Sequence, residues 1–363
     1  MEKVDRLIEK YIENKTFPGG VLLVGNDKEI LYKKAYGYKA IFPEKERNSE
    51  DTIYDLASLT KVVGTTPAVM KLLEEGEIRL WDSVGKFLKE FSKGEKEKVK
   101  IFHLLTHTSG LPPYSNAWKY AKNSEELKEE LLKTELSYNP GENLVYSCLN
   151  FIFLRYIVEK ITGISFDKFL KENIFEPLDM KDTGFLPRDK ERVAPTCERD
   201  GKLLRGEPDD ELAYYQGGIS GNAGLFSTAE DLYKYARSLI NKDYMIFSPY
   251  TIELFTKEHV SFKDEKRGLG WMIKSISSSC GDLFSERSFG HTGYTGTSLW
   301  IDPLKNLIII FLSNRTHISR KVIALADRSI TPPEENNLEN MIEFRPRLHN
   351  LIVIEIYKMQ KES

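Results

Sequence analysis

Hydrophobic positions near the start of the chain follow first a helical and then a strand-like pattern. Between residues 2 and 14, apolar side chains recur at helical spacing, which predicts an amphipathic helix. Two short apolar runs follow, at residues 21–24 and 30–36, and the Gly25-Asn26-Asp27 turn between them favours a β-hairpin. The chain therefore begins with one helix and a pair of adjacent strands.

The middle of the chain is helical in pattern, and strands return towards its end. Residues 57–75 form a long apolar helical stretch, and residues 102–260 carry mostly helical periodicity broken by Pro and Gly. From Leu338 onward the pattern is helical again, with Pro346 marking a start or a kink. The late strand-like runs are Leu269 to Ile273, Ser298 to Ile301 and Leu307 to Leu312.

Strands at both ends and helices between them indicate an α/β fold of the α+β type. Alternating βαβ units are absent, which argues against a doubly wound parallel sheet. We expect a central antiparallel sheet flanked by helices, within a single catalytic domain over residues 1–363. The sheet would come from residues 1–60 and 260–363, and a helical subdomain from an insertion at about 66–260. The active site would lie where the insertion meets the sheet.

Composition narrows the classes of function. The chain has 363 residues, is 40% hydrophobic and 29% charged, and carries a formal net charge of −3. Nothing in this balance indicates a surface for nucleic acid or for an anionic membrane. The apolar runs are too short to span a bilayer, and the first residues lack the pattern of a secretory signal.

Cysteine and glutamine usage bear on the cell compartment and the source. Cys148, Cys197 and Cys280 are too few and too scattered for a disulfide framework, and no CxxC spacing exists for a structural zinc site. An odd count fits a reduced compartment, so we expect a cytoplasmic protein. Gln216 and Gln360 are the only glutamines, against abundant Lys and Glu, which favours a thermophilic source.

The first candidate for chemistry is Ser58-Leu59-Thr60-Lys61. On a helix, residues three apart share a face, so the Lys61 amine can reach the Ser58 hydroxyl. A serine hydroxyl attacks a carbonyl only when a neighbouring base takes its proton. An ordinary lysine, with a pKa of about 10.4, is protonated at neutral pH. We therefore expect burial, or a nearby positive charge, to lower the pKa of Lys61.

Spacing alone does not select this serine. The Ser-x-x-Lys pattern also occurs at Ser83/Lys86 and at Ser165/Lys168, and any one match is more often a solvated pair on a helix. Ser58 is selected by what accompanies it along the chain.

Two later segments of the chain are the accompanying motifs. Tyr146-Ser147-Cys148 stands just before an apolar helical run, where a tyrosine held as a phenolate by cations can relay protons. His291-Thr292-Gly293 precedes a strand, and His291 can give a proton or a hydrogen bond. Gly293 would let a substrate backbone approach closely. The N–H of Tyr294 could then pair with that of Ser58 as an oxyanion hole. Taken singly, Tyr146 also fits a packed core tyrosine, and His291 a turn histidine.

The ordered set Ser-x-x-Lys, Tyr-Ser-x and His-Thr-Gly resembles the class C β-lactamase and penicillin-binding protein family of serine hydrolases. The resemblance covers roughly residues 5–315. It implies a β-lactamase/transpeptidase-like fold, acylation of Ser58, and proton transfers shared by Lys61 and Tyr146. The connecting segments that also match are Ile53 to Ser58, Glu75 to Asp82, Leu104 to Pro112, and Gly217 to Ser227.

Two departures from the family pattern bear on the substrate. Cys148 stands where the family usually has asparagine, and Asn150 lies two residues on. His291 stands where β-lactamases usually carry lysine, and histidine is largely neutral at pH 7. Both favour an esterase, or a peptidase acting on D-amino-acid derivatives. A true class C-like β-lactamase and a penicillin-binding sensor with little turnover remain as alternatives.

The remaining expectations concern ligands. Tyr114 follows Leu111-Pro112-Pro113, in a region that lines the substrate cleft in similar proteins, although it also fits a surface aromatic. His103 and His107 have the i, i+4 spacing of zinc helices but lack the glutamate of H-E-x-x-H, which speaks against a metal hydrolase. We expect a small-molecule or peptide substrate, no metal and no cofactor. Oligomeric state is left open.

Overall fold

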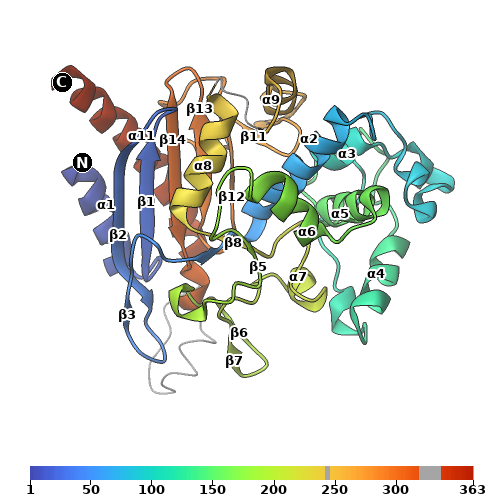
Figure 1. The fold of residues 1–363 in the computed structure, drawn as a ribbon, viewed down its shortest axis with the longest axis horizontal. Coiled ribbons are helices and arrows are strands. Elements are labelled where there is room, and N and C mark those ends of the chain that lie inside the picture. The colour runs from blue at the N-terminus through green and yellow to red at the C-terminus, as the bar shows by residue number, and fades with distance from the viewer. Residues whose placement is uncertain (242–245, 319–336, 363) are drawn as a thin grey trace.

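A nine-stranded antiparallel sheet forms one side of the molecule (Figure 1). The computed structural model describes residues 1–241, 246–318 and 337–362. The strand order is β3-β2-β1-β14-β13-β12-β11-β10-β9. These strands are β1 (Gly19–Gly25), β2 (Ile30–Ala40), β3 (Glu46–Arg47), β9 (Val260–Phe262), β10 (Glu265–Arg267), β11 (Met272–Ile273), β12 (Phe289–Thr292), β13 (Ser298–Asp302) and β14 (Leu307–Ser313).

The two ends of the sequence meet in the centre of this sheet. β1 pairs with β14 from Gly20 opposite Ser313 to Gly25 opposite Ile308. Both strands are buried along their whole length, because helices cover both faces of the sheet. α1 (Glu2–Glu13) and α11 (Asn337–Glu362) cover one face, and α8 (Ala229–Ile240) covers the other (Figure 1).

Alternation along β1 decides which side chains meet which helices. Leu22 and Val24 belong to the apolar cluster that includes α1 and α11. Val21 and Leu23 belong to the larger cluster on the other face, together with residues of α8. Successive side chains of a strand point to opposite faces, so one continuous apolar run serves two cores.

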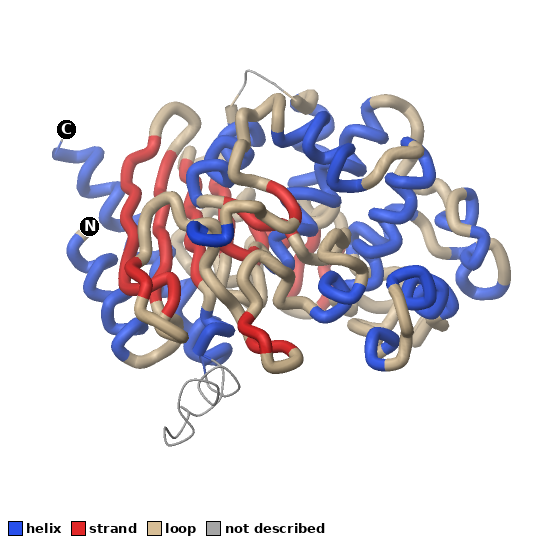
Figure 2. The backbone as a smooth tube through the Cα atoms, turned by 60° about the horizontal axis from the view of Figure 1, so that its bottom comes forward, coloured by secondary structure: helices blue, strands red, loops and turns tan. Residues whose placement is uncertain are grey.

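The insertion between the two parts of the sheet is mostly helical, and Figure 2 shows helices gathered at the end away from the long strands. Its helices are α2 (Thr66–Glu74), α3 (Ile101–Thr106), α4 (Ser124–Lys133), α5 (Cys148–Thr162), α6 (Phe166–Leu170), α7 (Glu211–Tyr215) and α9 (Pro249–Thr256). β4 (Tyr54–Asp55), β5 (Gly184–Phe185) and β8 (Leu225–Ser227) form a small second sheet, and β6 (Glu198–Arg199) and β7 (Lys202–Leu203) pair separately.

The antiparallel sheet with its flanking helices confirms the predicted fold class. Residues 319–336, inside the stretch assigned to the sheet, lie outside the described residues. The strand predicted over Leu269 to Ile273 is only Met272–Ile273, because Gly270 turns the chain with φ of +87°. Of the strands in this sheet, β3, β9, β10 and β12 were not predicted. Pro346 lies inside α11.

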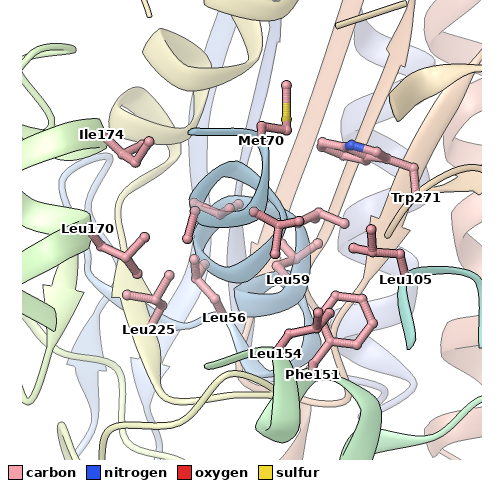
Figure 3. Packing of buried hydrophobic residues seen from close by; sticks show 14 of the residues in the cluster. Leu56, Leu59, Met70, Leu105, Phe151, Leu154, Leu170, Ile174, Leu225 and Trp271 are labelled. Atoms are coloured by element: carbon pink, nitrogen blue, oxygen red, sulfur yellow. The ribbon is translucent and has the colours of Figure 1, made fainter. Parts of the chain in front are cut away.

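The predicted helix over residues 57–75 is three segments. Residues Ala57–Leu59 form a 3₁₀ turn, Lys61–Thr65 a π-helical turn, and α2 follows. Apolar side chains from five other parts of the chain surround this segment. Figure 3 shows them packed around it: Leu105, Phe151, Leu154, Leu170, Ile174, Leu225 and Trp271. The apolar core thus fixes the position of the segment that carries Ser58.

In the described part of the chain, the search for a helix long and apolar enough to cross a bilayer finds none.

Candidate active site

Ser58 lies on a sharp turn that the preceding aspartate stabilises. Ala57 has a φ of +46°, in the left-handed region that non-glycine residues seldom adopt. The Asp55 carboxylate accepts a hydrogen bond from the Ala57 N–H (2.8 Å) and another from the Asp209 N–H (2.7 Å). Burial, together with the charge of Asp209, raises the pKa of Asp55 to about 7. The turn places Ser58 at the surface of the core, half-buried rather than enclosed.

The 3₁₀ turn explains why a three-residue spacing works here. Residues i and i+3 lie directly above one another in such a turn, so the Lys61 amine reaches the Ser58 side chain. The Lys61 Nζ lies 3.0 Å from the Ser58 Oγ and donates to it. The other two Ser-x-x-Lys matches have exposed lysines that pair with carboxylates, Lys86 with Asp82 and Lys168 with Glu172.

Lys61 is fully buried, and its contacts match the three hydrogens of an ammonium group. Besides Ser58, the Nζ donates to the backbone oxygen of Asn222 (2.9 Å) and to the Cys148 Sγ (3.7 Å). Its environment therefore offers an acceptor for each N–H of the cation.

The expectation that burial lowers the pKa of Lys61 is wrong. Burial pulls that pKa down, but Cys148, Tyr146 and Asp210 together raise it further, and the net direction is upward. Those groups favour the ammonium form because a negative charge, or an acceptor, beside an amine stabilises its proton. Lys61 is a cation in the free protein near neutral pH.

Tyr146 completes a three-group cluster with Ser58 and Lys61. The Tyr146 hydroxyl donates to the Ser58 Oγ (2.9 Å), and the Lys61 Nζ lies 5.0 Å from the centre of the Tyr146 ring. Burial raises the pKa of Tyr146, although the Lys61 charge opposes this shift. Tyr146 is thus a phenol, hydrogen-bonded to the hydroxyl of Ser58.

Cys148 and Asn150 have different surroundings. Cys148 begins α5 and presents its thiol to Lys61 at the edge of the cluster. Asn150 is buried in the core, where its amide accepts from the Ser109 hydroxyl (2.6 Å) and contacts the His107 Nδ1 (3.1 Å). Asn150 does not replace the missing side chain at position 148.

The His291-Thr292-Gly293 segment ends β12, and the turn that follows is fastened to the Ser58 turn. The Thr295 hydroxyl donates to the backbone oxygen of Asp55 (2.7 Å), and the Thr297 hydroxyl donates to the backbone oxygen of Leu56 (3.0 Å). From the other side, Arg345 of α11 donates to the backbone oxygens of Gly293 (3.0 Å) and Thr297 (3.1 Å). Tyr294, half-exposed, stands at the tip of this turn, and the guanidinium of Arg315 lies 4.2 Å from its ring centre.

Gly293 is where the two turns come closest. A Cβ placed there would lie 2.4 Å from the Leu56 oxygen and 2.1 Å from the Thr297 Oγ1. Sequence reasoning assigned this glycine to the approach of a substrate backbone, whereas the close approach in the structure is to the chain's own backbone. Only glycine lets this turn dock against the Ser58 turn.

We expect Gly293→Ala to lower kcat for ester hydrolysis by at least about 10²-fold, because the turn must move away from Ser58 by enough to disturb a tetrahedral transition state. Gly184→Ala is the matched control, since a Cβ at Gly184 meets nothing within 4 Å. Steady-state kinetics of both variants check this. Wild-type kcat in Gly293→Ala would contradict the close docking of the two turns.

His291 is a neutral imidazole. Its Nδ1 lies 2.8 Å from the backbone oxygen of Thr292. A backbone oxygen can only accept, so the proton is on Nδ1. Burial, with the charges of Arg267 and Lys61, holds the pKa of His291 well below its usual value. The His291 and Tyr146 rings lie 6.0 Å apart, and Thr292 follows as a half-buried residue at the end of β12. The structure thus brings His291 near Tyr146, in surroundings that favour its neutral form.

Tyr114 lies in the insertion and contacts the start of α7. Its hydroxyl donates to the Glu211 carboxylate (3.1 Å) and accepts from the Leu212 N–H (3.2 Å), at the start of α7. Burial, then the charge of Asp210, raises the pKa of Tyr114. The Asp210 carboxylate accepts from the Asn222 side-chain amide (3.1 Å), and the backbone oxygen of Asn222 accepts from Lys61. Asn222 thus connects Asp210, close to Tyr114, with Lys61.

Two residues of the site were not singled out as site residues from the sequence. The His107 ring lies 4.6 Å from the Tyr146 ring, and its Nδ1 accepts from the Ser147 N–H (3.1 Å). The guanidinium of Arg267, on β10, lies 5.5 Å from the centre of the Tyr146 ring. His107 stands within the Leu104 to Pro112 segment that matches the family, so the sequence did indicate that its surroundings matter. Arg267 has none, because it stands in a charged stretch with no local pattern.

In the part of the chain that the structure describes, no group of three His, Cys, Asp or Glu side chains is arranged to hold a metal ion. His103 uses its Nδ1 to accept from the Lys100 N–H (3.2 Å) at the start of α3.

Comparison with known proteins gives the family. The family model described as Beta-lactamase matches residues 4–330. The chain belongs to the beta-lactamase family. This membership agrees with the resemblance drawn from the Ser-x-x-Lys, Tyr-Ser-x and His-Thr-Gly motifs.

Relatives within this family carry names of amide hydrolases. An N-acetylmuramyl-L-alanine amidase of Bacillus subtilis is 33% identical over 406 residues, covering 99% of this chain and 88% of the relative. A candidate D-alanyl-D-alanine carboxypeptidase of Escherichia coli is 32% identical over 361 residues, covering 87% of this chain and 82% of the relative.

Solved structures of the family share the fold. An octameric penicillin-binding protein homologue from Pyrococcus abyssi aligns with a TM-score of 0.74 at 26% identity, covering 90% of this chain and 75% of that one. A hydrolase with promiscuous acyltransferase activity has a TM-score of 0.74 at 20% identity, with 95% and 98% covered. The fold is β-lactamase/transpeptidase-like, and the chain is a serine hydrolase that cleaves an ester or an amide.

Proposed function

We propose that Ser58 is the nucleophile and forms an acyl-enzyme with its substrate. The observation that carries this is the cluster in which Lys61 and Tyr146 both hydrogen-bond to the Ser58 Oγ, at 3.0 and 2.9 Å. No other Ser-x-x-Lys pair among the described residues has such a cluster, since Lys86 and Lys168 face solvent carboxylates.

In this proposal the Lys61–Tyr146 pair acts as the base after it has lost one proton. The Ser58 Oγ–H gives its proton to the pair while the Oγ bonds to the substrate carbonyl carbon. The pair then passes that proton to the leaving oxygen or nitrogen as the carbonyl–leaving group bond breaks. Water repeats the sequence on the acyl-enzyme and releases the acid. The N–H groups of Ser58 and Tyr294 are proposed to stabilise the oxyanion in both halves.

The proposed substrate is an ester, or an amide of a D-amino-acid derivative. One relative is named for a D-alanyl-D-alanine bond, and another is named an N-acetylmuramyl-L-alanine amidase, so both names give an amide bond at an alanine residue. A neutral His291 and the thiol of Cys148 replace groups with which β-lactamases meet their substrates, so a β-lactam is the second candidate. We propose Tyr114, Cys148, Thr292 and Gly293 as residues that contact the substrate.

A substrate panel tests this proposal. p-Nitrophenyl esters, D-alanyl amides and a chromogenic cephalosporin are compared on the wild type and on Ser58→Ala. We expect steady turnover of an ester or a D-alanyl amide that depends on Ser58. Fast turnover of the cephalosporin alone would favour the β-lactamase, and a single burst without further release would favour a sensor.

The pH dependence of the rate follows from the groups around Ser58. Both Lys61 and Tyr146 have raised pKa values, so the pair loses its proton only as the pH becomes alkaline. We expect kcat/KM to rise with pH through the alkaline range. Between about pH 5.5 and 7.5, His291 should contribute no step, because burial and the charges of Arg267 and Lys61 hold its pKa well below the usual value and favour the neutral imidazole.

The pH–rate profiles of the wild type and of His291→Gln check this. The two profiles should have the same shape, with His291→Gln lower by one constant factor. A step near pH 6.5 that is present in the wild type and missing in His291→Gln would show that His291 titrates in the working range.

We propose a cytoplasmic location on the ground that Cys148, Cys197 and Cys280 are all unpaired thiols. Fractionation of the source cells with activity as the marker tests it. The thermophilic source remains a prediction, and a melting temperature of the purified protein bears on it.

A further inference from the structure

Arg267 is a buried cation beside the proposed catalytic tyrosine. Its guanidinium lies 5.5 Å from the centre of the Tyr146 ring, and the residue is only 5% exposed. It stands on β10, between β11 and the edge strand β9 of the large sheet. A cation over the face of an aromatic ring is attracted to it, and more strongly so when the ring carries a phenolate.

The hydrogen bonds of Arg267 leave one side of the guanidinium directed at the site. Its Nε donates to the Glu265 carboxylate (2.6 Å), and its Nη2 contacts the same oxygen. Its Nη1 is buried and, among the described residues, has no hydrogen-bond partner. The Nε2 atoms of His107 and His291 are also buried without such a partner in the same part of the chain.

The charge of Arg267 already acts on its neighbours. After burial, it is the largest cause that lowers the pKa of both His107 and His291. Both histidines are therefore neutral, and the position where β-lactamases usually carry a lysine supplies no charge here. The cations close to Tyr146 in the described structure are Lys61 and Arg267.

We propose that Arg267 supplies the positive charge that, together with Lys61, stabilises the proton-accepting form of the Lys61–Tyr146 pair during turnover. In this chain the charge has moved from the His291 position on β12 to β10. Arg267 is a positioning residue, since it acts on the reaction through Tyr146. The inference rests on the proposed roles of Ser58, Lys61 and Tyr146.

The charged and titratable groups around the Lys61–Tyr146 pair come from several elements of the fold. Glu265 opposes Arg267, but its side chain is 34% exposed, so water screens it more than it screens the arginine. Asp210 and Cys148, which belong to the insertion, favour the protonated form of the Lys61–Tyr146 pair. The full set of these groups is Ser58, Lys61, His107, Cys148, Asp210, Glu265, Arg267 and His291.

The test compares pH profiles of kcat/KM for a p-nitrophenyl ester. In Arg267→Gln the alkaline limb should move up by about one pH unit, because a charge at this distance acts through a mixed protein and solvent medium. The rate at pH 7 should then fall about tenfold and recover at alkaline pH. In Glu265→Gln the limb should move the other way, by about half a unit, since the opposing charge is gone.

Lys266→Gln is the matched control, because it removes a positive charge one residue away that pairs with Glu258 outside the site. Its profile should match the wild type. A rate in Arg267→Gln that falls by one factor at every pH, with no shift beyond that of Lys266→Gln, overturns the inference. If Arg267→Gln does not fold, a downward shift in Glu265→Gln supports it, and an unchanged or upward shift overturns it.

Failure of the underlying roles would look different. Turnover that persists in Ser58→Ala refutes the proposed nucleophile. An unshifted profile in a Ser58-dependent enzyme refutes only the role of Arg267.

Discussion

Ser58→Ala is expected to abolish hydrolysis of every substrate that the wild type cleaves, with a loss of at least about 10³-fold in kcat. The reason is covalent: without the Oγ there is no atom to form the acyl-enzyme, and the hydrogen bonds from Lys61 and Tyr146 have no acceptor at that position. The remaining rate would come only from the oxyanion site and from substrate binding. The measurement is steady-state turnover of a p-nitrophenyl ester.

Covalent labelling gives the same prediction a second readout. A fluorophosphonate should add one equivalent to the wild type, seen by intact mass, and none to Ser58→Ala. Ser83→Ala and Ser165→Ala are the matched controls, since these serines belong to the other two Ser-x-x-Lys matches and should leave labelling unchanged. Labelling that persists in Ser58→Ala would refute the assignment. Thermal unfolding should change little, because Ser58 is half-buried and its neighbours remain.

Lys61→Met should be the second most damaging change, lowering kcat by about 10³-fold or more. Methionine fills much the same buried volume without a charge, so the core around the π-helical turn should hold. The proton that leaves the Ser58 Oγ then has only Tyr146 to receive it, and the cation that favours the phenolate is lost. We expect the alkaline rise in kcat/KM to shift up or disappear as well.

Lys86→Met and Lys168→Met are the matched controls for this prediction. Both lysines follow a serine at the same spacing, and both are more than half-exposed. Each should retain wild-type kcat within about twofold, since surface ion pairs contribute little. A loss in Lys86→Met equal to that in Lys61→Met would contradict the special role of the buried cluster around Lys61.

The sequence predicted the central part of the fold because long buried runs leave a clear signal. β1 and β14 are apolar along their length, and both were placed as strands from that pattern. β9 and β10 were missed because each has only three residues, too few to show an alternating pattern, and Glu265–Arg267 is charged throughout. β12 was missed because its four residues carry the site motif rather than an alternating pattern.

The site was predictable where the chemistry is local and not where it depends on distant contacts. Ser58, Lys61, Tyr146 and His291 each stand in a short motif, and the structure brings them together. The raised pKa of Lys61 could not be foreseen, because it depends on Cys148 and other groups that reach it from far along the sequence. Arg267 is hidden for the same reason.

The protonation of Asp55, beside the Ser58 turn, also depends on contacts with residues far along the sequence. Asp55 holds the Ala57 N–H, and its raised pKa comes from burial against Asp209, more than 150 residues later. A local pattern identifies Asp55 as part of a lead-in motif but says nothing about its protonation.

The pairing of β1 with β14 has a consequence for a chain that is still being made. The segment with Ser58 leaves the ribosome well before the turn at Gly293, the strand Leu307–Ser313 and Arg345, which holds that turn. Domains fold as units, so the two turns cannot dock until these parts emerge. A nascent chain of this hydrolase therefore carries the proposed nucleophile long before its active site can form, and we expect it to stay inert towards the esters and amides around it until these later parts have emerged.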